Sequence, residues 1–261
     1  MANQQSVILV AHPDDEILWF SSMVEKVDRI LICFGPCPSR KDWTVGRAKS
    51  LKELPLNHIT SLNIVESEVF NLSHFDRPVL TEYGLKIKGN GHRTKNYVNN
   101  YATIREKIKF FLQGVDKVYT HNPWGEYGNE EHVQVYRAVK SLQSEMGYEI
   151  WFDNYASNKT APLMLDTINR FNPKIEAKTP NSVLGFEFMQ IYKKNACWTW
   201  YGHWKWPYQD VFIKDGLDCH RNSSGFPGTV LPINMIHLET NRKQSKTDRF
   251  KHLAHKIIDR I

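Results

Sequence analysis

The chain carries a histidine and three acidic residues in one short run near its start, Ala11-His12-Pro13-Asp14-Asp15-Glu16. Imidazole nitrogens and carboxylate oxygens are ligands that zinc takes from proteins, and a carboxylate beside such a centre can act as a general base. The acids could instead cap a helix and complement its dipole, although one acid would suffice and capping does not require His12. The residue types therefore leave two open interpretations, metal-centred chemistry and helix capping.

The flanking sequence predicts where this run lies in the fold. Residues 7–11 form a continuous apolar run, the pattern of a strand buried on both faces. Downstream, apolar residues recur at helical spacing from Ile17 to Val27. Pro13 biases His12 towards extended geometry, so we expect the strand to end at the histidine and a helix to start at the acids. This turn is then at the carboxyl end of a parallel strand, where open α/β sheets bind their ligands.

A second candidate half-site follows a later strand, predicted at residues 115–120. His132 falls in the first turn of the helix after that strand, again at a strand's carboxyl end. Taken alone, it is more simply an exposed histidine behind an Asn129 cap. Together with His12 and Asp15, it would complete a two-histidine, one-carboxylate metal site with positions left open for water and substrate.

The run Ala-His-Pro-Asp-Asp-Glu, in its strand-to-helix context, resembles the signature of the LmbE/PIG-L family of metal-dependent N-deacetylases. The resemblance covers about residues 1–150. It implies that His12, Asp15 and His132 bind Zn²⁺, with Fe²⁺ or Co²⁺ as other ions that such a set can hold. It also implies that the metal polarises the acetamide carbonyl and a water, while Asp14 takes the water's proton and returns it to the leaving amine.

The resemblance also marks one departure from the family. Members carry His-x-x-His at the start of the helix that corresponds to 130–146 here. His132 matches the last histidine of this motif, but Asn129 stands at the position of the first. In the family that first histidine helps to stabilise or protonate the transition state, so the role of Asn129 here is open. Tyr127 matches a family tyrosine that stabilises the oxyanion. We expect Glu16 to orient a metal ligand.

Arginines and tryptophans supply the candidate substrate contacts. Arg47, Arg77 and Arg93 could bind an acidic group of the substrate, although each also suits a solvated surface. Trp124 and Trp200 could stack on a sugar or an acyl chain.

The aromatic stretch 192–206 resembles that of family members acting on surface-polysaccharide or antibiotic sugars. Half of the chain's tryptophans lie in the overlapping stretch 197–208. Its alternate spacing equally predicts one face of a strand packed on the core. The substrate class implied is an N-acylated amino sugar or its glycoconjugate, and a phosphate- or nucleotide-linked form would suit the basic charge.

The order of apolar runs predicts an α/β fold with a doubly wound, mostly parallel sheet, Rossmann-like and of LmbE type. We expect a single domain over residues 1–261, with a core at about 1–155 and an aromatic-rich, substrate-shaping region at about 156–261. Strands are predicted at 7–11, 29–34, 64–70, 115–120, 148–152 and 182–192. Helices are predicted from the acids 14–16 to about 27, at 43–54, 97–112, 130–146, 162–171 and, amphipathic, in the tail 241–260, with a long loop at 71–96.

Composition narrows the partners and the compartment. The net charge is +6, but the basic residues are scattered until the tail, so we expect no nucleic-acid partner. The start lacks a basic n-region and a long apolar run, and the four cysteines lack zinc-ribbon spacing. We therefore expect a cytoplasmic protein with reduced thiols and no membrane span; a homo-oligomer is compatible with the sequence.

The sequence is also compatible with two alternatives to a deacetylase. A ferrous oxygenase uses the same two-histidine, one-carboxylate ligands, although usually as His-x-Asp on a jelly roll. A sugar-binding protein whose deacetylase site has lapsed is conceivable because of Asn129.

Overall fold

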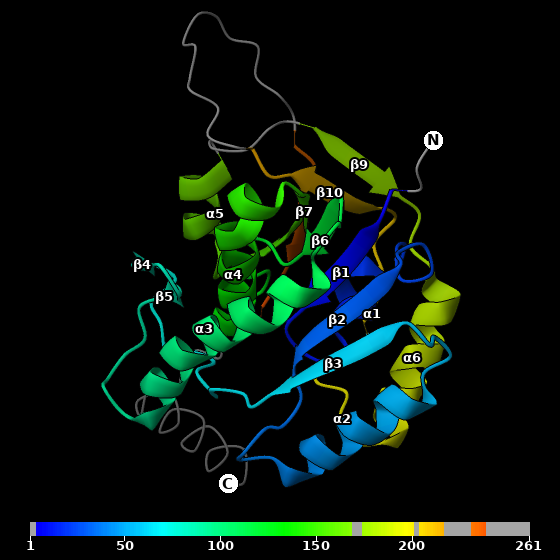
Figure 1. The fold of residues 1–261 in the computed structure, drawn as a ribbon, viewed down its shortest axis with the longest axis horizontal. Helices are drawn as coiled ribbons and strands as arrows, with labels where there is room; N and C mark the ends of the chain where they lie inside the picture. Colours follow the sequence, from blue (N-terminus) through cyan, green and yellow to red (C-terminus); the bar gives the residue numbers. More distant parts are fainter. Residues whose placement is uncertain (1–3, 169–173, 201–203, 217–230, 239–261) are drawn as a thin grey trace, which may run out of the picture.

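The computed structural model describes residues 4–168, 174–200, 204–216 and 231–238. Within them a seven-stranded sheet runs in the order β3-β2-β1-β6-β7-β10-β9 (Figure 1). The pairings from β3 through β7 are parallel, whereas β10 is antiparallel to both of its neighbours. The predicted α/β fold with a mostly parallel sheet is therefore confirmed. In sheet order the strands are Ile59–Ile64, Arg29–Phe34, Ser6–Val10, Lys117–Thr120, Glu149–Asp153, Asp210–Lys214 and Ile175–Lys178.

Helices cover both faces of this sheet (Figure 1). Val7 and Leu9 of β1 pack in one core cluster with α3, α4 and α5, whereas Ile8 and Val10 pack in the other with α1 and α6. The continuous apolar run of β1 follows from this double coverage. The helices α1 to α6 are Asp15–Phe20, Lys41–Glu53, His92–Phe111, Glu130–Met146, Ala161–Ile168 and Ser182–Lys194.

Two smaller sheets complete the described residues. β8 (Tyr155–Ser157) pairs in parallel with β11 (Asn234–Ile236). The segment predicted as a long loop, 71–96, contains an antiparallel hairpin of β4 (Leu80–Thr81) and β5 (Gly84–Leu85), and α3 already begins within it. None of the helices in the described part of the chain combines the length and the apolar character needed to cross a bilayer.

The strand predicted at 182–192 is wrong, because this segment is helix α6. The Asn181 side chain accepts a hydrogen bond from the backbone N–H of Leu184 and so caps the helix. Leu184, Phe188 and Tyr192 are buried at a spacing of four residues, which is the helical period rather than that of a strand.

The third strand also differs from its prediction. β3 ends at Ile64, where the predicted strand 64–70 was to begin, and β9 and β10 were not predicted. Helix α1 begins at Asp15, among the predicted acids, but ends at Phe20 and is therefore shorter than predicted. The predicted amphipathic helix in the tail 241–260 lies outside the described residues.

Candidate active site

The structure brings the three predicted metal ligands together at the carboxyl ends of two neighbouring strands. β1 pairs with β6, so the turn after β1 and the start of α4 lie at one edge of the sheet. Nδ1 of His12 and Nε2 of His132 each lie 3.3 Å from Oδ2 of Asp15. One ligand atom from each of these residues can be chosen so that all three lie within 4.8 Å of one another, and all three residues are buried.

Two further carboxylates fix the orientation of the histidines. His12 Nε2 lies 3.0 Å from Oε2 of Glu131, and His132 Nδ1 hydrogen-bonds to Glu126. A carboxylate accepts the N–H, so the opposite nitrogen of each ring faces Asp15 and can bind a metal ion once it has lost its proton. Nε2 of His132 is buried and forms no hydrogen bond. This donor set therefore fits a divalent cation, which would bind Nε2 of His132 in place of a proton.

The electrostatics of the cluster also suit a cation. Burial disfavours the charged imidazole of His12, but hydrogen bonds to Asp15 and Glu131 outweigh it and raise its pKa to about 10. Burial also disfavours the charged imidazole of His132, but the charges of Asp15 and Glu126 outweigh it and raise the pKa of His132 to about 9. The metal-free cluster thus holds protons that a metal ion must displace, so metal affinity is expected to fall as pH falls.

Asp14 lies beside the cluster in a backbone conformation that few residues adopt. Its φ is 101°, and its side chain is buried. Oδ2 accepts hydrogen bonds from the backbone N–H and the hydroxyl of Thr199, at 3.0 and 2.6 Å, while Oδ1 has no hydrogen-bond partner. Burial and the neighbouring charge of Asp15 raise the pKa of Asp14 to about 7. Such a carboxyl group can take and return a proton near neutral pH.

Glu16 supports this turn and does not belong to the ligand cluster. Its Oε2 accepts from the backbone N–H of Asp14 at 3.0 Å, and its Oε1 accepts from the hydroxyl of Tyr192 at 2.6 Å. Burial raises the pKa of Glu16 to about 8. Its contacts orient Asp14, whereas the sequence predicted that it would orient a metal ligand.

Tyr127 and Asn129 lie next to His132. The Tyr127 ring is half-buried and meets the His132 ring edge-on, with the centroids 5.4 Å apart. Asn129 donates from Nδ2 to the Tyr127 hydroxyl at 3.0 Å and accepts at Oδ1 from the backbone N–H of Glu131. Asn129 is therefore both the cap of α4 and a partner of Tyr127, and the phenolic hydrogen of Tyr127 is left available for donation.

The predicted substrate arginines are not gathered at the cluster. Arg47 is only 2% exposed and donates to the carbonyl of Gly35 and to Glu66, which itself lies 3.5 Å from Nε2 of His12. Arg77 and Arg93 are exposed. Arg47 is thus a buried support for the His12 side of the cluster, and its prediction as a substrate contact is corrected.

Trp124 is likewise a core residue and not a surface for substrate. It is fully buried, and its Nε1 donates to the backbone carbonyl of Tyr155 at 2.6 Å. Its ring packs edge-on against Phe152 of β7. The Trp124 ring therefore has no exposed face for a ligand in this structure.

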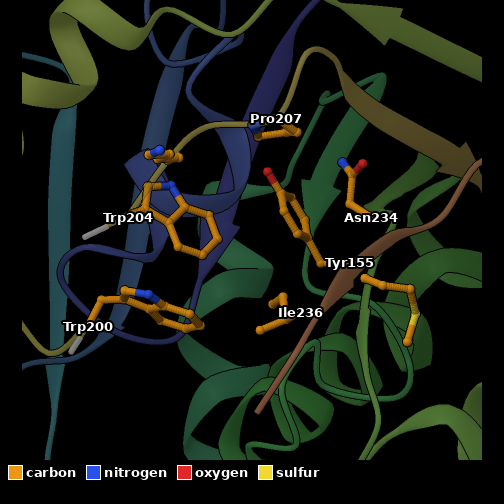
Figure 2. Close-up of a pocket in the computed structure, with 8 residues that line it drawn as sticks. Tyr155, Trp200, Trp204, Pro207, Asn234 and Ile236 are labelled. Atoms are coloured by element: carbon orange, nitrogen blue, oxygen red, sulfur yellow. The ribbon is translucent and has the colours of Figure 1, made fainter. Parts of the chain in front are cut away.

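Trp200 does border an open cavity (Figure 2). The cavity has a volume of about 350 Å³ and is walled by aromatic, aliphatic and a few polar side chains. Trp19 connects it to the cluster, because its ring meets Trp200 and Trp204 edge-on and its Nε1 donates to Oδ1 of Asp15 at 2.9 Å. The lining residues are Tyr155, Trp200, Trp204, Lys205, Pro207, Asn234, Met235 and Ile236.

Comparison with known proteins connects this fold to deacetylases. No family model matches the chain, and no curated protein matches its sequence. The structure is similar to a deacetylase–bog complex from the biosynthesis pathway of teicoplanin, with a TM-score of 0.50 at 13% identity over 81% of this chain and 97% of that one. It is also similar to the zinc inhibited form of teicoplanin deacetylase Orf2, with a TM-score of 0.50 at 10% identity over the same shares. At such identities the likeness establishes the shared fold.

Proposed function

We propose that this protein is a metal-dependent hydrolase that removes an N-acyl group, acetyl in the simplest case, from an amino sugar. The observation that carries the proposal is the convergence of His12, Asp15 and His132 around the unused Nε2 of His132, with Asp14 beside them. The fold shared with teicoplanin deacetylases and the sequence resemblance to the LmbE/PIG-L family support it.

His12, Asp15 and His132 would hold the cation, for which we propose Zn²⁺. When bound, the ion would supply a Lewis acid for the amide carbonyl and the attacking water. Asp14 accepts the proton that the water loses as the new carbon–oxygen bond forms. As the carbon–nitrogen bond breaks, Asp14 returns that proton to the leaving amine, so that the products are a free amino sugar and a carboxylic acid, which then loses its remaining proton to solvent.

Tyr127 is the proposed donor to the oxyanion, and Asn129 holds it in place. Asn129 donates a hydrogen bond to the Tyr127 hydroxyl oxygen, so the phenolic hydrogen points away from the Asn129 side chain. This hydrogen is therefore free to be donated to the oxyanion. Burial raises the pKa of Tyr127 well above its usual value, which keeps this hydrogen on the oxygen at neutral pH. A neutral donor aimed at developing charge is the arrangement that stabilises acyl-transfer transition states.

The cavity in Figure 2 is the proposed place for the parts of the substrate beyond the scissile amide. Its volume of about 350 Å³ exceeds what an acetyl group needs, and Trp200 and Trp204 offer ring faces for a sugar or an acyl chain. Lys205 is the basic residue that lines it, so a phosphate or nucleotide group would meet Lys205 and not the predicted arginines.

Amine release tests the proposal directly. Zinc-loaded protein should liberate free amine from at least one of a panel of N-acylated hexosamines and their glycosides, with acyl chains from acetyl to octanoyl. Chelation should stop the release, and added Zn²⁺ should restore it. A fully metal-loaded protein that binds panel sugars without releasing amine would instead be the sugar-binding alternative. Oxygen consumption by the ferrous protein would point to the oxygenase, for which the parallel sheet gives no support.

Replacing Asn129 tests how the chain works without the first histidine of the family's His-x-x-His motif. Asn129→Ala should lower kcat by an amount equivalent to roughly 1–3 kcal/mol, because Tyr127 loses its partner but Asp14 still carries the proton. The α4 cap is lost as well, which should cost about 1 kcal/mol of stability. Asn129→Ser is the matched control, since serine can still cap the helix. Complete loss of activity in Asn129→Ala with metal retained would show that Asn129 does more than hold Tyr127.

A further inference from the structure

Two hydrogen bonds join Asp14 to Thr199, a residue far along the chain. Thr199 donates two hydrogen bonds to the same oxygen, Oδ2 of Asp14, from its backbone N–H and from its hydroxyl. A carboxylate held twice on one oxygen cannot rotate about its last bond without breaking both contacts. The other oxygen, Oδ1, is buried and keeps its lone pairs free.

The segment that carries Thr199 is itself fixed against α1 and α6. Ala196 adopts a positive φ of 55°, after which the backbone N–H of Cys197 donates to the carbonyl of Tyr192 at 3.0 Å. Further along, Nε1 of Trp206 donates to the carbonyl of Ile17 in α1 at 2.8 Å. The chain is thus anchored on either side of Thr199, so the threonine is presented to Asp14 from a supported backbone.

Thr199 also stands next to the cavity wall. Its neighbour Trp200 packs edge-on against Trp19 and Tyr127 with centroid distances of 5.7 and 5.4 Å. The same short segment therefore contacts the proposed base through Thr199 and shapes the proposed substrate cavity through Trp200.

We propose that Thr199 is a positioning residue for Asp14: it holds Oδ2 so that Oδ1 is the oxygen that meets the reacting water. This inference rests on the proposed deacylase function and assigns a role in turnover to the aromatic stretch. Thr199 touches neither the proposed metal ligands nor the reacting atoms, so its effect is on the geometry of proton transfer. Loss of the Thr199 side-chain contact should lower kcat and leave metal affinity unchanged.

The test replaces the hydroxyl at constant shape. Thr199→Val keeps the backbone hydrogen bond to Asp14 but removes the one from Oγ1. We expect kcat to fall about tenfold to a hundredfold, the scale for a displaced catalytic group, with KM and metal content near the wild-type values. Thr199→Ser restores the hydroxyl and should return most of the lost kcat.

A second variant separates positioning from general anchoring of the segment. Trp206→Phe removes the segment's hydrogen bond to Ile17 and leaves the contacts of Asp14 in place. It should lower the melting temperature while kcat stays near the wild-type value. In the Asp14→Asn background, Thr199→Val should have little further effect on kcat, because both changes act through one group.

Three results would overturn the inference: an unchanged kcat in Thr199→Val, failure of Thr199→Ser to restore kcat, or an equal kcat loss in Trp206→Phe. Each of these leaves the proposed function standing, provided that the wild-type protein releases amine. Absence of amine release by the metal-loaded wild-type protein would overturn the proposed function, and this inference with it.

Discussion

Alanine at His132 is expected to remove tight zinc binding from this protein. The purified wild-type chain should hold about one divalent ion, and three protein ligands are the minimum for such a site, so the loss of one leaves too few. Nε2 of His132 is buried and forms no hydrogen bond, so the variant removes a nitrogen that is available to the metal ion. His12→Ala and Asp15→Ala should behave alike, and amine release should disappear in all three.

A graded variant and a matched control sharpen this prediction. Glu126→Gln keeps the size of the side chain but replaces the carboxylate that hydrogen-bonds to both His121 and His132, and should weaken metal affinity about tenfold to a hundredfold. His92→Ala removes an exposed histidine at the start of α3 and should leave affinity unchanged. Competition with a chromophoric chelator measures all of these. Full metal occupancy in His132→Ala would refute the ligand assignment.

The pH dependence of metal binding follows from the same cluster. The pKa values of His12 and His132 are raised to about 10 and about 9, so both rings are protonated at neutral pH in the metal-free protein. The ion must displace these protons, and affinity should therefore rise as pH rises from 6 towards 9. Proton release on zinc addition, measured in a weakly buffered solution, is the accompanying signal.

The half of the site that is contiguous in sequence was predictable. Residues 7–16 combine a buried strand, a proline that ends it and acids that start a helix, and the structure reproduces each step from β1 to α1. The second half was predictable in position, since α4 has the predicted bounds Glu130–Met146. Local patterns place each half of the site at the carboxyl end of a strand. The two halves meet because β1 and β6 are neighbours in a parallel sheet.

The supporting contacts could not be predicted, because their partners are far apart in the sequence. Glu131 meets His12 across 119 positions, and Thr199 meets Asp14 across 185. Glu126 left a weak local signal, since it sits between Gly125 and Gly128 in a loop with several positive φ values, including its own at 46°. Such a loop suggests a functional constraint but does not say which side chain it serves.

The misassigned α6 has a different cause. Its sequence, Ser-Val-Leu-Gly-Phe-Glu-Phe-Met-Gln-Ile-Tyr, is rich in the aromatic and β-branched residues that favour strands. Packing overrides this preference: Phe188 and Tyr192 are fully buried on the α1 side of the sheet, while Val183 and Phe186 remain exposed. The Asn181 cap was the available sequence signal for a helix start.

Asparagine at position 14 is expected to lower the rate at least about a hundredfold while metal is retained, the usual scale for loss of a general base. The substitution keeps the shape of the side chain and an oxygen that can accept from Thr199. Asparagine also tolerates the left-handed backbone that Asp14 adopts, so the turn should persist. Asp28→Asn, which changes an exposed aspartate at the other end of β1, is the matched control and should keep the wild-type rate.

Stability should move in the opposite direction from activity in Asp14→Asn. In the folded, metal-free protein, burial and Asp15 raise the pKa of Asp14 from 3.8 to about 7. The folded state therefore binds this proton more tightly than the unfolded state, and stability falls as pH rises through that interval. Above about pH 7 wild-type Asp14 is charged in the folded state and its burial lowers stability in full. The neutral side chain in Asp14→Asn does not carry this cost. The metal-free variant should therefore melt no lower than wild type at pH 8. A clearly lower melting temperature together with a near-normal rate would show that the Asp14 carboxylate stabilises the fold through Thr199 and takes no part in proton transfer.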